Sequence, residues 1–362
     1  MIYENMPRGA QNFPEQSMLT LEKSEDLIIR QCSGCGTVQT TSIPVDYYRD
    51  VIRAAAYSTE MSTFRRQQFN DLNSRYDFDK KKVIEIGCGR GEYLTLMNQA
   101  GWDAYGVEHL QTSVDHAMKT GLRVEQNYLE NADTRLNGAP FDAFVIFNFL
   151  EHIPDISRFL SAIRANLTQD GIGLVEVPNF DMMLRQSLST EFIADHIYYF
   201  SESTLRRTLE INGFDVVESR VIWHDYIISA IVKKRQGLDF TGFTHHEKHL
   251  RNEISSFLDE TGKGRLAVWG AGHQALATIT LTGIADRIDY VIDSAPFKQN
   301  KYTPASHLPI YGPGILDDDP VDTILIMAAA YSQEIANQIR TRYGGKFQLA
   351  ILNETGLDVL AR

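Results

Sequence analysis

The chain has 362 residues, and its 47 Asp and Glu outnumber its 35 Lys and Arg, which gives a formal net charge of −12. Hydrophobic residues make up 43% and charged residues 23%, a composition typical of globular proteins that excludes a disordered or collagen-like chain. The acidic balance disfavours a general nucleic-acid binder, because such binding depends on Lys and Arg that neutralise phosphates. A chain of this length is expected to form two or three domains.

Cysteine content and the length of apolar stretches indicate the cellular location of the protein. The three cysteines, Cys32, Cys35 and Cys88, are too few for the framework of a disulfide-rich secreted protein. The N-terminal MIYENMPRGA has neither the basic nor the apolar region of a signal peptide, and no stretch reaches the ~18 apolar residues of a membrane helix. We therefore expect a cytoplasmic protein without a membrane partner.

The patterning divides the chain into three regions. Residues 1–70 begin irregular and polar, and they end in a helix-like run, which predicts a small N-terminal lobe. Residues 71–235 alternate β-rich runs with helical segments, a spacing typical of βαβ units around a parallel sheet. The predicted strands of this region are 83–87, 103–108, 122–126, 143–148, 172–178 and 227–234.

The alternation restarts after a charged, helix-like stretch at 247–262 that is interpreted as a linker. Further strands are predicted at 265–272, 289–293 and 323–329. The expected fold is α/β, with a small N-terminal lobe (1–70), a Rossmann-like core (71–235) and a second Rossmann-like α/β domain (236–362).

The strongest local feature is a strand that runs into Gly87-x-Gly89-x-Gly91, with a helix behind it. Glycines permit a tight turn close to a ligand, and the helix N-terminus offers unpaired N–H groups. The next strand ends in Glu108, where a carboxylate can accept hydrogen bonds from ribose hydroxyls. Glu85 would repel a pyrophosphate, which argues against a dinucleotide. The alternative is a strand-to-helix turn that binds nothing.

This pattern resembles motif I of the class I S-adenosylmethionine (SAM)-dependent methyltransferases. The resemblance implies SAM as cofactor, with Glu85 and the three glycines at its methionine moiety and Glu108 at its ribose. Gln126 and Asn127 follow the third strand, where the family contacts adenine, and 147–153 resembles the segment beside the donor. The cofactor-binding residues implied by the resemblance are Glu85, Gly87, Gly89, Gly91, Glu108, Asn127, Phe147 and Asn148.

Three further segments resemble the C-methyltransferases that act on nucleotide-linked keto-deoxysugars. The first is the Tyr- and Ser-rich stretch 56–69, and the second is Asp195-His196-x-x-Tyr-Phe-Ser, where the family usually has Glu-His. The third comprises 268–275, 291–299 and 308–310, which match the family's glycine turn, its Asp-x-x-Pro-x-Lys-Gln and its Pro-Ile in order. The resemblance covers nearly the whole chain.

A base must remove a proton if the methyl acceptor is carbon or a hydroxyl, and histidine is suited to this near neutral pH. His196 lies in the connection after a predicted strand, where α/β active sites assemble. The resemblance implies that His196 removes a proton beside a ketone and that Tyr57 acts as a proton donor or stabilises the oxyanion. It also implies that Asp195 holds or polarises the sugar, and Tyr198 is assigned to substrate binding. Alternatively, Tyr57 is a core aromatic and Asp195-His196 caps the following helix.

The C-terminal domain is expected to help enclose a nucleotide-sugar acceptor. Gly270-x-Gly272 opens a helix and could bind a phosphate, although close strand–helix packing also requires glycine. Lys298 and Lys301 would supply positive charge for a diphosphate. The predicted acceptor-binding residues of this domain are Gly270, Gly272, His273, Asp293, Lys298 and Lys301.

Cys32-x-x-Cys35 resembles a rubredoxin-type knuckle, which in the related family forms a zinc site with a second Cys-x-x-Cys upstream. A structural zinc takes four ligands, yet residues 1–31 contain no Cys or His and the first histidine is His109. Cys88 belongs to the glycine turn. We therefore expect no zinc and no other metal.

The leading hypothesis is a SAM-dependent methyltransferase that C-methylates a nucleotide-linked keto-deoxysugar through an enolate generated by His196. One alternative is an O- or N-methyltransferase of a sugar or another small metabolite. A second alternative, from a different class, is a non-catalytic binding protein that retains the fold.

Overall fold

The computed structural model describes residues 1–11, 13–45, 47–50, 58–354 and 356–361. Contacts divide the chain into two compact units, Met1–Gly237 and Leu238–Arg362, and each has its own hydrophobic core. No helix in the described residues combines the length and the apolar character needed to cross a membrane.

The first unit begins with a small antiparallel sheet in the order β1-β2-β3-β9. Three strands come from the N-terminal lobe, and β9 comes from the segment directly after His196. Leu27 and Val45 of the lobe share a core with Phe180, Phe192 and Tyr199. The lobe is therefore joined to the loop that carries the predicted base. The four strands are β1 (Ile2–Met6), β2 (Glu25–Gln31), β3 (Val38–Thr40) and β9 (Tyr198–Tyr199).

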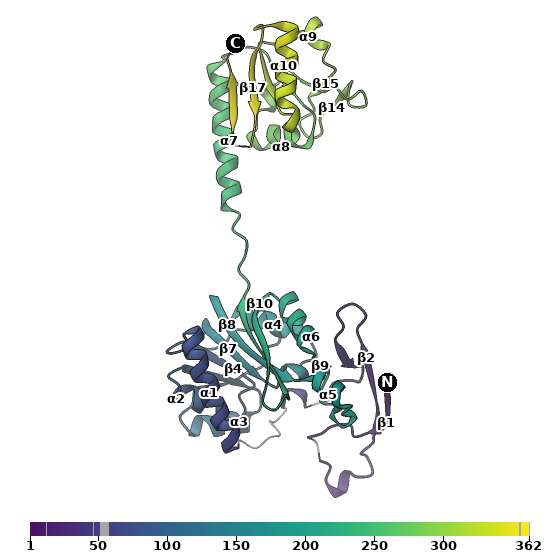
Figure 1. Cartoon of the computed structure of the whole chain (residues 1–362), viewed down its shortest axis with the longest axis vertical. Helices are drawn as coiled ribbons and strands as arrows, with labels where there is room; N and C mark the ends of the chain where they lie inside the picture. Colours follow the sequence, from purple (N-terminus) through teal and green to yellow (C-terminus); the bar gives the residue numbers. More distant parts are fainter. Residues whose placement is uncertain (12, 46, 51–57, 355, 362) are drawn as a thin grey trace. The chain divides into compact units, whose positions relative to one another are not determined.

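The main sheet of this unit has seven strands in the order β10-β11-β8-β7-β4-β5-β6 (Figure 1). Strands β6, β5, β4, β7 and β8 are parallel, and β11 and β10 extend the edge antiparallel. This confirms the predicted Rossmann-like sheet. Its strands are β4 (Lys82–Ile86), β5 (Asp103–Glu108), β6 (Val124–Gln126), β7 (Phe141–Phe147), β8 (Leu167–Pro178), β10 (Phe214–Ile222) and β11 (Ile227–Lys234).

Strand β10 was not predicted from the sequence. A bulge between Val216 and Glu218 interrupts its pairing with β11, and such a bulge breaks the two-residue alternation by which a half-buried strand is recognised.

Both faces of the main sheet are buried. Along β4 and β7, Ile84 and Phe144 face the core beneath α4 and α6, whereas Val83 and Val145 face the core beneath α1 and α2. Burial on both faces explains why these strands appear as continuous apolar runs. The helices of this unit are α1 (Thr59–Tyr76), α2 (Glu92–Gln99), α3 (Gln111–Lys119), α4 (Ile156–Ala165), α5 (Phe180–Gln186) and α6 (Glu202–Ile211).

The second unit also contains a mixed seven-stranded sheet, in the order β14-β15-β13-β12-β16-β17-β18. Its central strands are parallel and both edge strands are antiparallel, which confirms the predicted second α/β fold. The strands are β12 (Leu266–Trp269), β13 (Tyr290–Ile292), β14 (Lys301–Tyr302), β15 (Pro309–Tyr311), β16 (Thr323–Ile326), β17 (Gln348–Leu352) and β18 (Leu357–Leu360).

Helix α7 (Thr241–Glu260) contains the stretch interpreted as a linker. Ile254, Phe257 and Leu258 of α7 are buried in the core of the second unit, so this part of the helix belongs to that fold. The other helices of the unit are α8 (His273–Thr282), α9 (Ile315–Asp318) and α10 (Ser332–Tyr343). Single 3-10 turns complete the chain: η1 (Gln16–Met18), η2 (Tyr48–Asp50), η3 (Leu150–His152), η4 (Ser189–Glu191), η5 (Ala285–Arg287) and η6 (Ala329–Tyr331).

Candidate active site

The glycine turn connects β4 to α2 through three residues with positive φ. The φ angles are 73° at Gly87, 56° at Gly89 and 86° at Gly91, a region that residues with a Cβ rarely adopt. At Gly91 an added Cβ would also lie 2.4 Å from Leu122 Cδ1. At Gly89 the nearest atom would be 4.0 Å away, so the backbone there is open to a ligand.

Glu108 ties the end of β5 to this turn. Its carboxylate accepts hydrogen bonds from the backbone N–H of Gly89 (2.9 Å) and of Leu110 (2.9 Å). Glu85 lies 1% exposed on β4, two residues before the turn. The structure thus places the glycines beside both acidic residues that the sequence assigned to the donor.

A pocket opens between this turn and the ends of β5 and β6. Of the predicted donor residues, Gly87, Glu108 and Asn127 line it. Its other lining residues are Arg49, Ile86, Val107, His109, Tyr128, Leu129, Phe149 and Phe159. The lining is mostly apolar, with the carboxylate of Glu108 and the guanidinium of Arg49 among its polar groups.

Arg49, on η2, lines this pocket, and the sequence analysis did not predict it as a site residue. Its guanidinium carbon lies 4.8 Å from the centre of the Tyr128 ring, and its Nη2 lies 2.9 Å from Glu130. Arg49 is far from the other lining residues along the chain, so no local pattern connects them.

Phe147, the last residue of β7, and Asn148, which follows it, lie in different environments. Asn148 has a φ of 48°, and its Oδ1 is buried with no hydrogen-bond partner among the described residues. A strained polar residue with an open acceptor is typical of a ligand site. Phe147 instead packs in the core, with its ring centre 5.0 Å from that of Tyr93 and 4.4 Å from the guanidinium carbon of Arg65.

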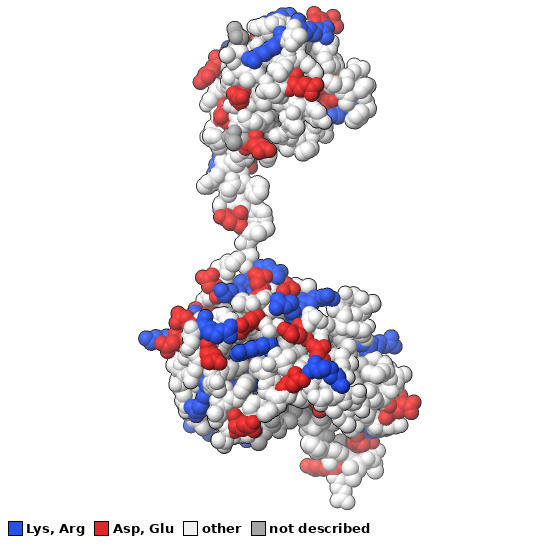
Figure 2. Space-filling view, in the orientation of Figure 1, with Lys and Arg blue, Asp and Glu red and all other residues white. Residues whose placement is uncertain are grey.

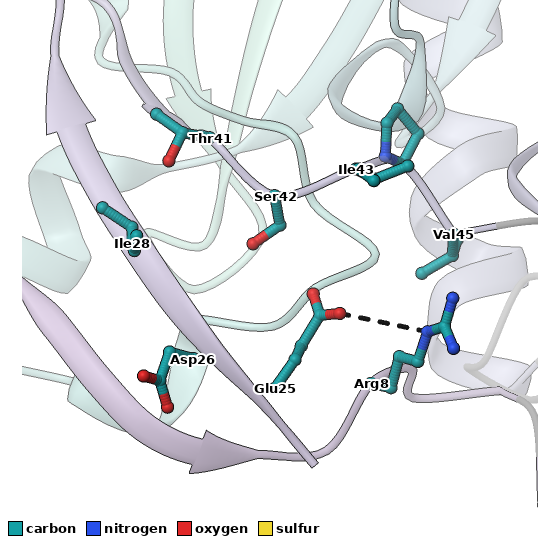
Figure 3. A pocket seen from close by; sticks show the side chains of 9 residues that line it. Arg8, Glu25, Asp26, Ile28, Thr41, Ser42, Ile43 and Val45 are labelled. Carbon is teal, nitrogen blue, oxygen red and sulfur yellow. Dashed lines mark ion pairs between the residues drawn. The ribbon is translucent and has the colours of Figure 1, made fainter. Parts of the chain in front are cut away.

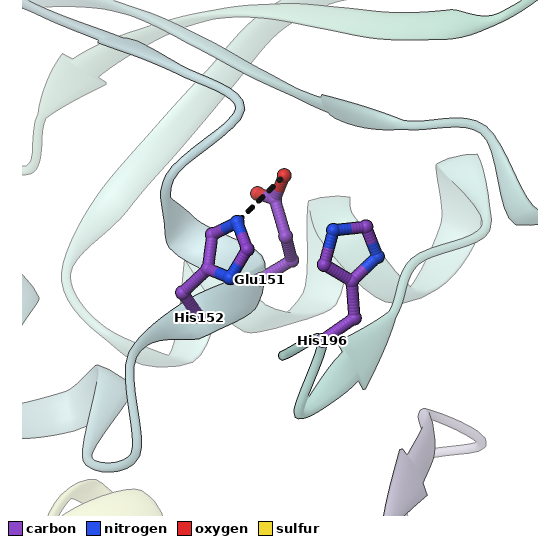
Figure 4. Close-up of side chains that lie close together, drawn as sticks. All are labelled: Glu151, His152 and His196. Carbon is purple, nitrogen blue, oxygen red and sulfur yellow. Dashed lines mark ion pairs between the residues drawn. The ribbon is translucent and has the colours of Figure 1, made fainter. Parts of the chain in front are cut away.

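His196, which is half-buried, forms a cluster with the buried Glu151 and His152 (Figure 4). One ligand atom of each of the three side chains lies within 4.8 Å of the others, and the two histidine rings are 4.8 Å apart at 72°. Burial lowers the pKa of His196 to about 3, and the neighbouring His152 lowers it further. The imidazole of His196 is therefore neutral at physiological pH.

His152 is held in one tautomer. Its Nδ1 lies 2.8 Å from the backbone carbonyl oxygen of Asp195, which can only accept, so Nδ1 carries the proton and Nε2 has a free lone pair. Burial lowers the pKa of His152, so this ring is neutral as well.

The carboxylate of Asp195 binds the N-terminal lobe. One oxygen accepts the backbone N–H of Ala10 (2.6 Å) and the other accepts the hydroxyl of Tyr47 (2.8 Å). Burial raises the pKa of Tyr47 to about 12, and the Asp195 carboxylate adds to this. Asp195 thus anchors the lobe, a role that sequence reasoning did not foresee.

The other predicted residues of this region are Tyr198 and Tyr57. The half-buried Tyr198 donates its hydroxyl to the backbone oxygen of Pro154 (3.0 Å). Tyr57 lies outside the described residues.

In the second unit, Asp293 organises the glycine turn. Its carboxylate accepts the backbone N–H of Ala271 (2.8 Å) and of Ala295 (2.9 Å) and the Nζ of Lys298 (2.8 Å). Burial opposes the charge, but these hydrogen bonds lower the pKa of Asp293 overall. Lys298 is therefore already paired, whereas Lys301 on β14 is exposed.

The two glycines of that turn differ in what surrounds them. A Cβ on Gly270 would lie 2.5 Å from the backbone oxygen of Met327, so close packing alone requires glycine there. Gly272 and His273 lie at the exposed N-terminus of α8, and a Cβ on Gly272 would meet nothing within 4 Å.

The knuckle cysteines are free thiols. The Cys35 thiol lies 3.3 Å from the hydroxyl of Thr37, and this hydrogen bond is the main cause of its lowered pKa. Across the described residues, the one group of three potential metal ligands is Glu151, His152 and His196. The absence of zinc from the knuckle stays a prediction.

A second pocket lies in the N-terminal lobe and shares no residue with the predicted sites (Figure 3). Arg8 and Glu25 face each other across it, with 3.9 Å between Nε and Oε2. On the face of the first unit shown in Figure 2, acidic and basic side chains are interspersed, so this face offers no continuous basic surface.

Comparison with known families agrees with this geometry. The methyltransferase domain family matches residues 57–219, and the C-methyltransferase C-terminal domain family matches residues 233–351. The chain is a SAM-dependent methyltransferase. It belongs to class I and carries the C-methyltransferase C-terminal domain, so the hypothesis of a non-catalytic binding protein is wrong.

Individual relatives are distant. The C-methyltransferase NovU of Streptomyces niveus is 24% identical over 305 residues, which cover 75% of this methyltransferase and 73% of NovU. A ubiquinone biosynthesis O-methyltransferase of Haemophilus ducreyi is 33% identical over 185 residues, 48% of this chain and 75% of that relative. Among solved structures, the magnesium protoporphyrin IX methyltransferase of Synechocystis with bound SAH is 16% identical over 52% of this chain and 93% of that one, with a TM-score of 0.40.

Proposed function

We propose that this SAM-dependent C-methyltransferase transfers a methyl group to the carbon beside the ketone of a nucleotide-linked keto-deoxysugar, with His196 as the base. The observation that carries the proposal is the position of the half-buried His196 beside Glu151 and His152, in the segment between η4 and β9. The C-methyltransferase C-terminal domain and the similarity to NovU support methylation at carbon.

In this proposal, the pocket beside the glycine turn holds part of SAM. The open backbone at Gly89 can approach the methionine moiety, Glu108 can take the ribose hydroxyls, and the apolar wall can take the adenine. We assign Glu85, Gly87, Gly91, Asn127, Phe147 and Asn148 to the same donor site. SAM supplies an electrophilic methyl group, so the protein must align the acceptor carbon with that group and generate the carbanion.

His196 can accept a proton without first losing one, because its pKa lies far below neutral pH. Tyr57 would stabilise the oxygen of the resulting enolate. Asp195 would fix the position of the His196 loop and contact the sugar, and Tyr198 would line the acceptor site.

The second unit would bind the nucleotide of the acceptor. The open N-terminus of α8 at Gly272 and His273 and the exposed Lys301 offer positive potential to a diphosphate. Gly270, Asp293 and Lys298 would shape that turn. In this assignment the chain comprises the lobe (1–70), the SAM-binding domain (71–235) and the acceptor-binding domain (236–362).

Incubation of the purified chain with SAM and a panel of TDP-, GDP- and CDP-linked keto sugars tests the proposal. We expect one sugar to gain the mass of one methylene and to wash in solvent deuterium beside its ketone. Replacing His196 by Ala should slow this exchange by about 10²- to 10⁴-fold. Methylation with no deuterium wash-in would instead favour O-methylation, which the similarity to the ubiquinone biosynthesis O-methyltransferase supports.

A further inference from the structure

Glu151 is a buried acid that the proposed mechanism leaves without a role. It lies on η3 and is 1% exposed. Its Oε2 has no hydrogen-bond partner among the described residues. Burial raises the pKa of Glu151 to about 8. An isolated carboxylate is costly to bury, so its presence here calls for a function.

Among the described residues, His152 and His196 lie beside the carboxylate of Glu151. Oε1 of Glu151 lies 3.8 Å from Nε2 of His152, and the ligand atoms of Glu151 and His196 are within 4.8 Å of each other (Figure 4). One water molecule can bridge such a gap. The negative charge of Glu151 contributes slightly to the raised pKa of Tyr226, but the hydroxyl of Tyr226 donates its hydrogen bond to Glu191 (3.0 Å). The described residues place no Lys or Arg in an ion pair with Glu151.

His196 is poorly suited to retain a proton that it takes from carbon. Burial and the neighbouring His152 lower the pKa of His196 to about 3, so the imidazolium is strongly disfavoured. Within the cluster, Glu151 is the group with the highest affinity for a proton. The carboxylate of Glu151 lies within 4.8 Å of His196, and its Oε2 has no hydrogen-bond partner among the described residues, so it is placed to take the proton from His196.

We infer that Glu151 is the terminal proton acceptor of the enolisation, with His196 as the relay between the acceptor sugar and this carboxylate. The inference rests on the proposed function. The C–H bond beside the ketone breaks, its electron pair enters the enolate, and one ring nitrogen of His196 gains the proton. The other ring nitrogen releases its proton through a bridging water to Glu151, which becomes a carboxylic acid. The enolate carbon then accepts the methyl group, and the electrons of the broken C–S bond stay on the donor sulfur.

The relay requires the carboxylate form of Glu151 before each turnover. Exchange should therefore be slow at pH 6, where Glu151 is protonated, should be half-maximal near pH 8 and should reach a plateau at about pH 9–10. A divalent cation on the same three side chains is the competing interpretation. It would require the cluster to contract, because ligands at ~2.0–2.2 Å from zinc lie closer to each other than 4.8 Å.

The test is deuterium exchange beside the ketone of the sugar, measured from pH 6 to 10 with SAH in place of SAM, so that no methyl transfer occurs. Wild type should show the rise, Glu151→Asp should keep it, and Glu151→Gln should lose it with a rate about 100-fold lower. Glu191→Gln is the matched control and should behave as wild type, because Glu191 bonds the hydroxyl of Tyr226 outside the cluster. Unchanged SAH affinity confirms that each variant is folded.

An unchanged pH profile in Glu151→Gln would overturn this inference alone. Exchange that a chelator abolishes and zinc restores would also overturn it, in favour of a metal-bound base. A wild-type chain that methylates none of the keto sugars would overturn the proposed function, and the relay with it.

Discussion

The buried ion pair between Arg65 and Glu176 offers the most quantitative test of the fold around the active site. The two side chains are 2% and 0% exposed, and their closest atoms are 2.5 Å apart. Glu176 also accepts hydrogen bonds from Gln68 (2.5 Å) and Ser229 (3.1 Å), and its backbone oxygen accepts the N–H of Asn148 (2.9 Å). The pair therefore joins α1 to β8 and β11 beneath the strained end of β7.

Glu176→Gln should destabilise this region by about 3–5 kcal/mol, because it leaves a buried guanidinium without a counter-charge. Arg65→Met should cost less, since a carboxylate can be neutralised by a proton whereas a guanidinium keeps its charge. The double variant Arg65→Met/Glu176→Leu should lie close to wild type, because apolar replacements remove both desolvated charges.

The assay is hydrogen-exchange mass spectrometry of the full chain, with peptides from α1 and β8. At ~1.4 kcal/mol per tenfold change, Glu176→Gln should accelerate their exchange by about 10²- to 10³-fold or more. Peptides from β12 in the second unit serve as an internal reference. Glu218→Gln breaks the exposed pair with Arg75 and should cost at most about 1 kcal/mol. The reasoning fails if Glu176→Gln costs no more than Glu218→Gln.

Three other outcomes are expected. Gly91→Ala should lower the free energy of unfolding by about 2–5 kcal/mol in thermal unfolding, because it puts a Cβ on a left-handed backbone and 2.4 Å from Leu122. Gly121 also has a positive φ (82°), but a Cβ there would meet nothing within 4 Å, so Gly121→Ala should cost only about 1–2 kcal/mol. Glu108→Ala should weaken SAM binding at least about tenfold by calorimetry, with Gly121→Ala unchanged; equal affinities would remove Glu108 from the ribose site. The hydrogen bond from Lys298 helps to keep the pKa of the Asp293 carboxyl low. The ionised carboxylate should therefore stabilise the second unit above about pH 4, and this stabilisation should be lost as the pH falls further. Lys298→Met should make hydrogen exchange of β12 less dependent on pH in this range.

The sequence alone determined the features that depend on neighbouring residues. The apolar strand, the three glycines and the acid that ends the next strand predicted the donor turn, because backbone dihedrals and strand periodicity are local properties. The two α/β folds followed from the same alternation. The bulged β10 was missed because its pattern is interrupted at Val216.

Tertiary structure decided how distant side chains meet. Arg49 contacts Tyr128 and lines the pocket beside the glycine turn, and the Asp195 carboxylate accepts hydrogen bonds from Ala10 and Tyr47 of the N-terminal lobe. The sequence predicted His196 as the base, but only packing brought the buried Glu151 within 4.8 Å of it. Burial and proximity set the protonation of these groups, and both arise when segments far apart in the chain pack together.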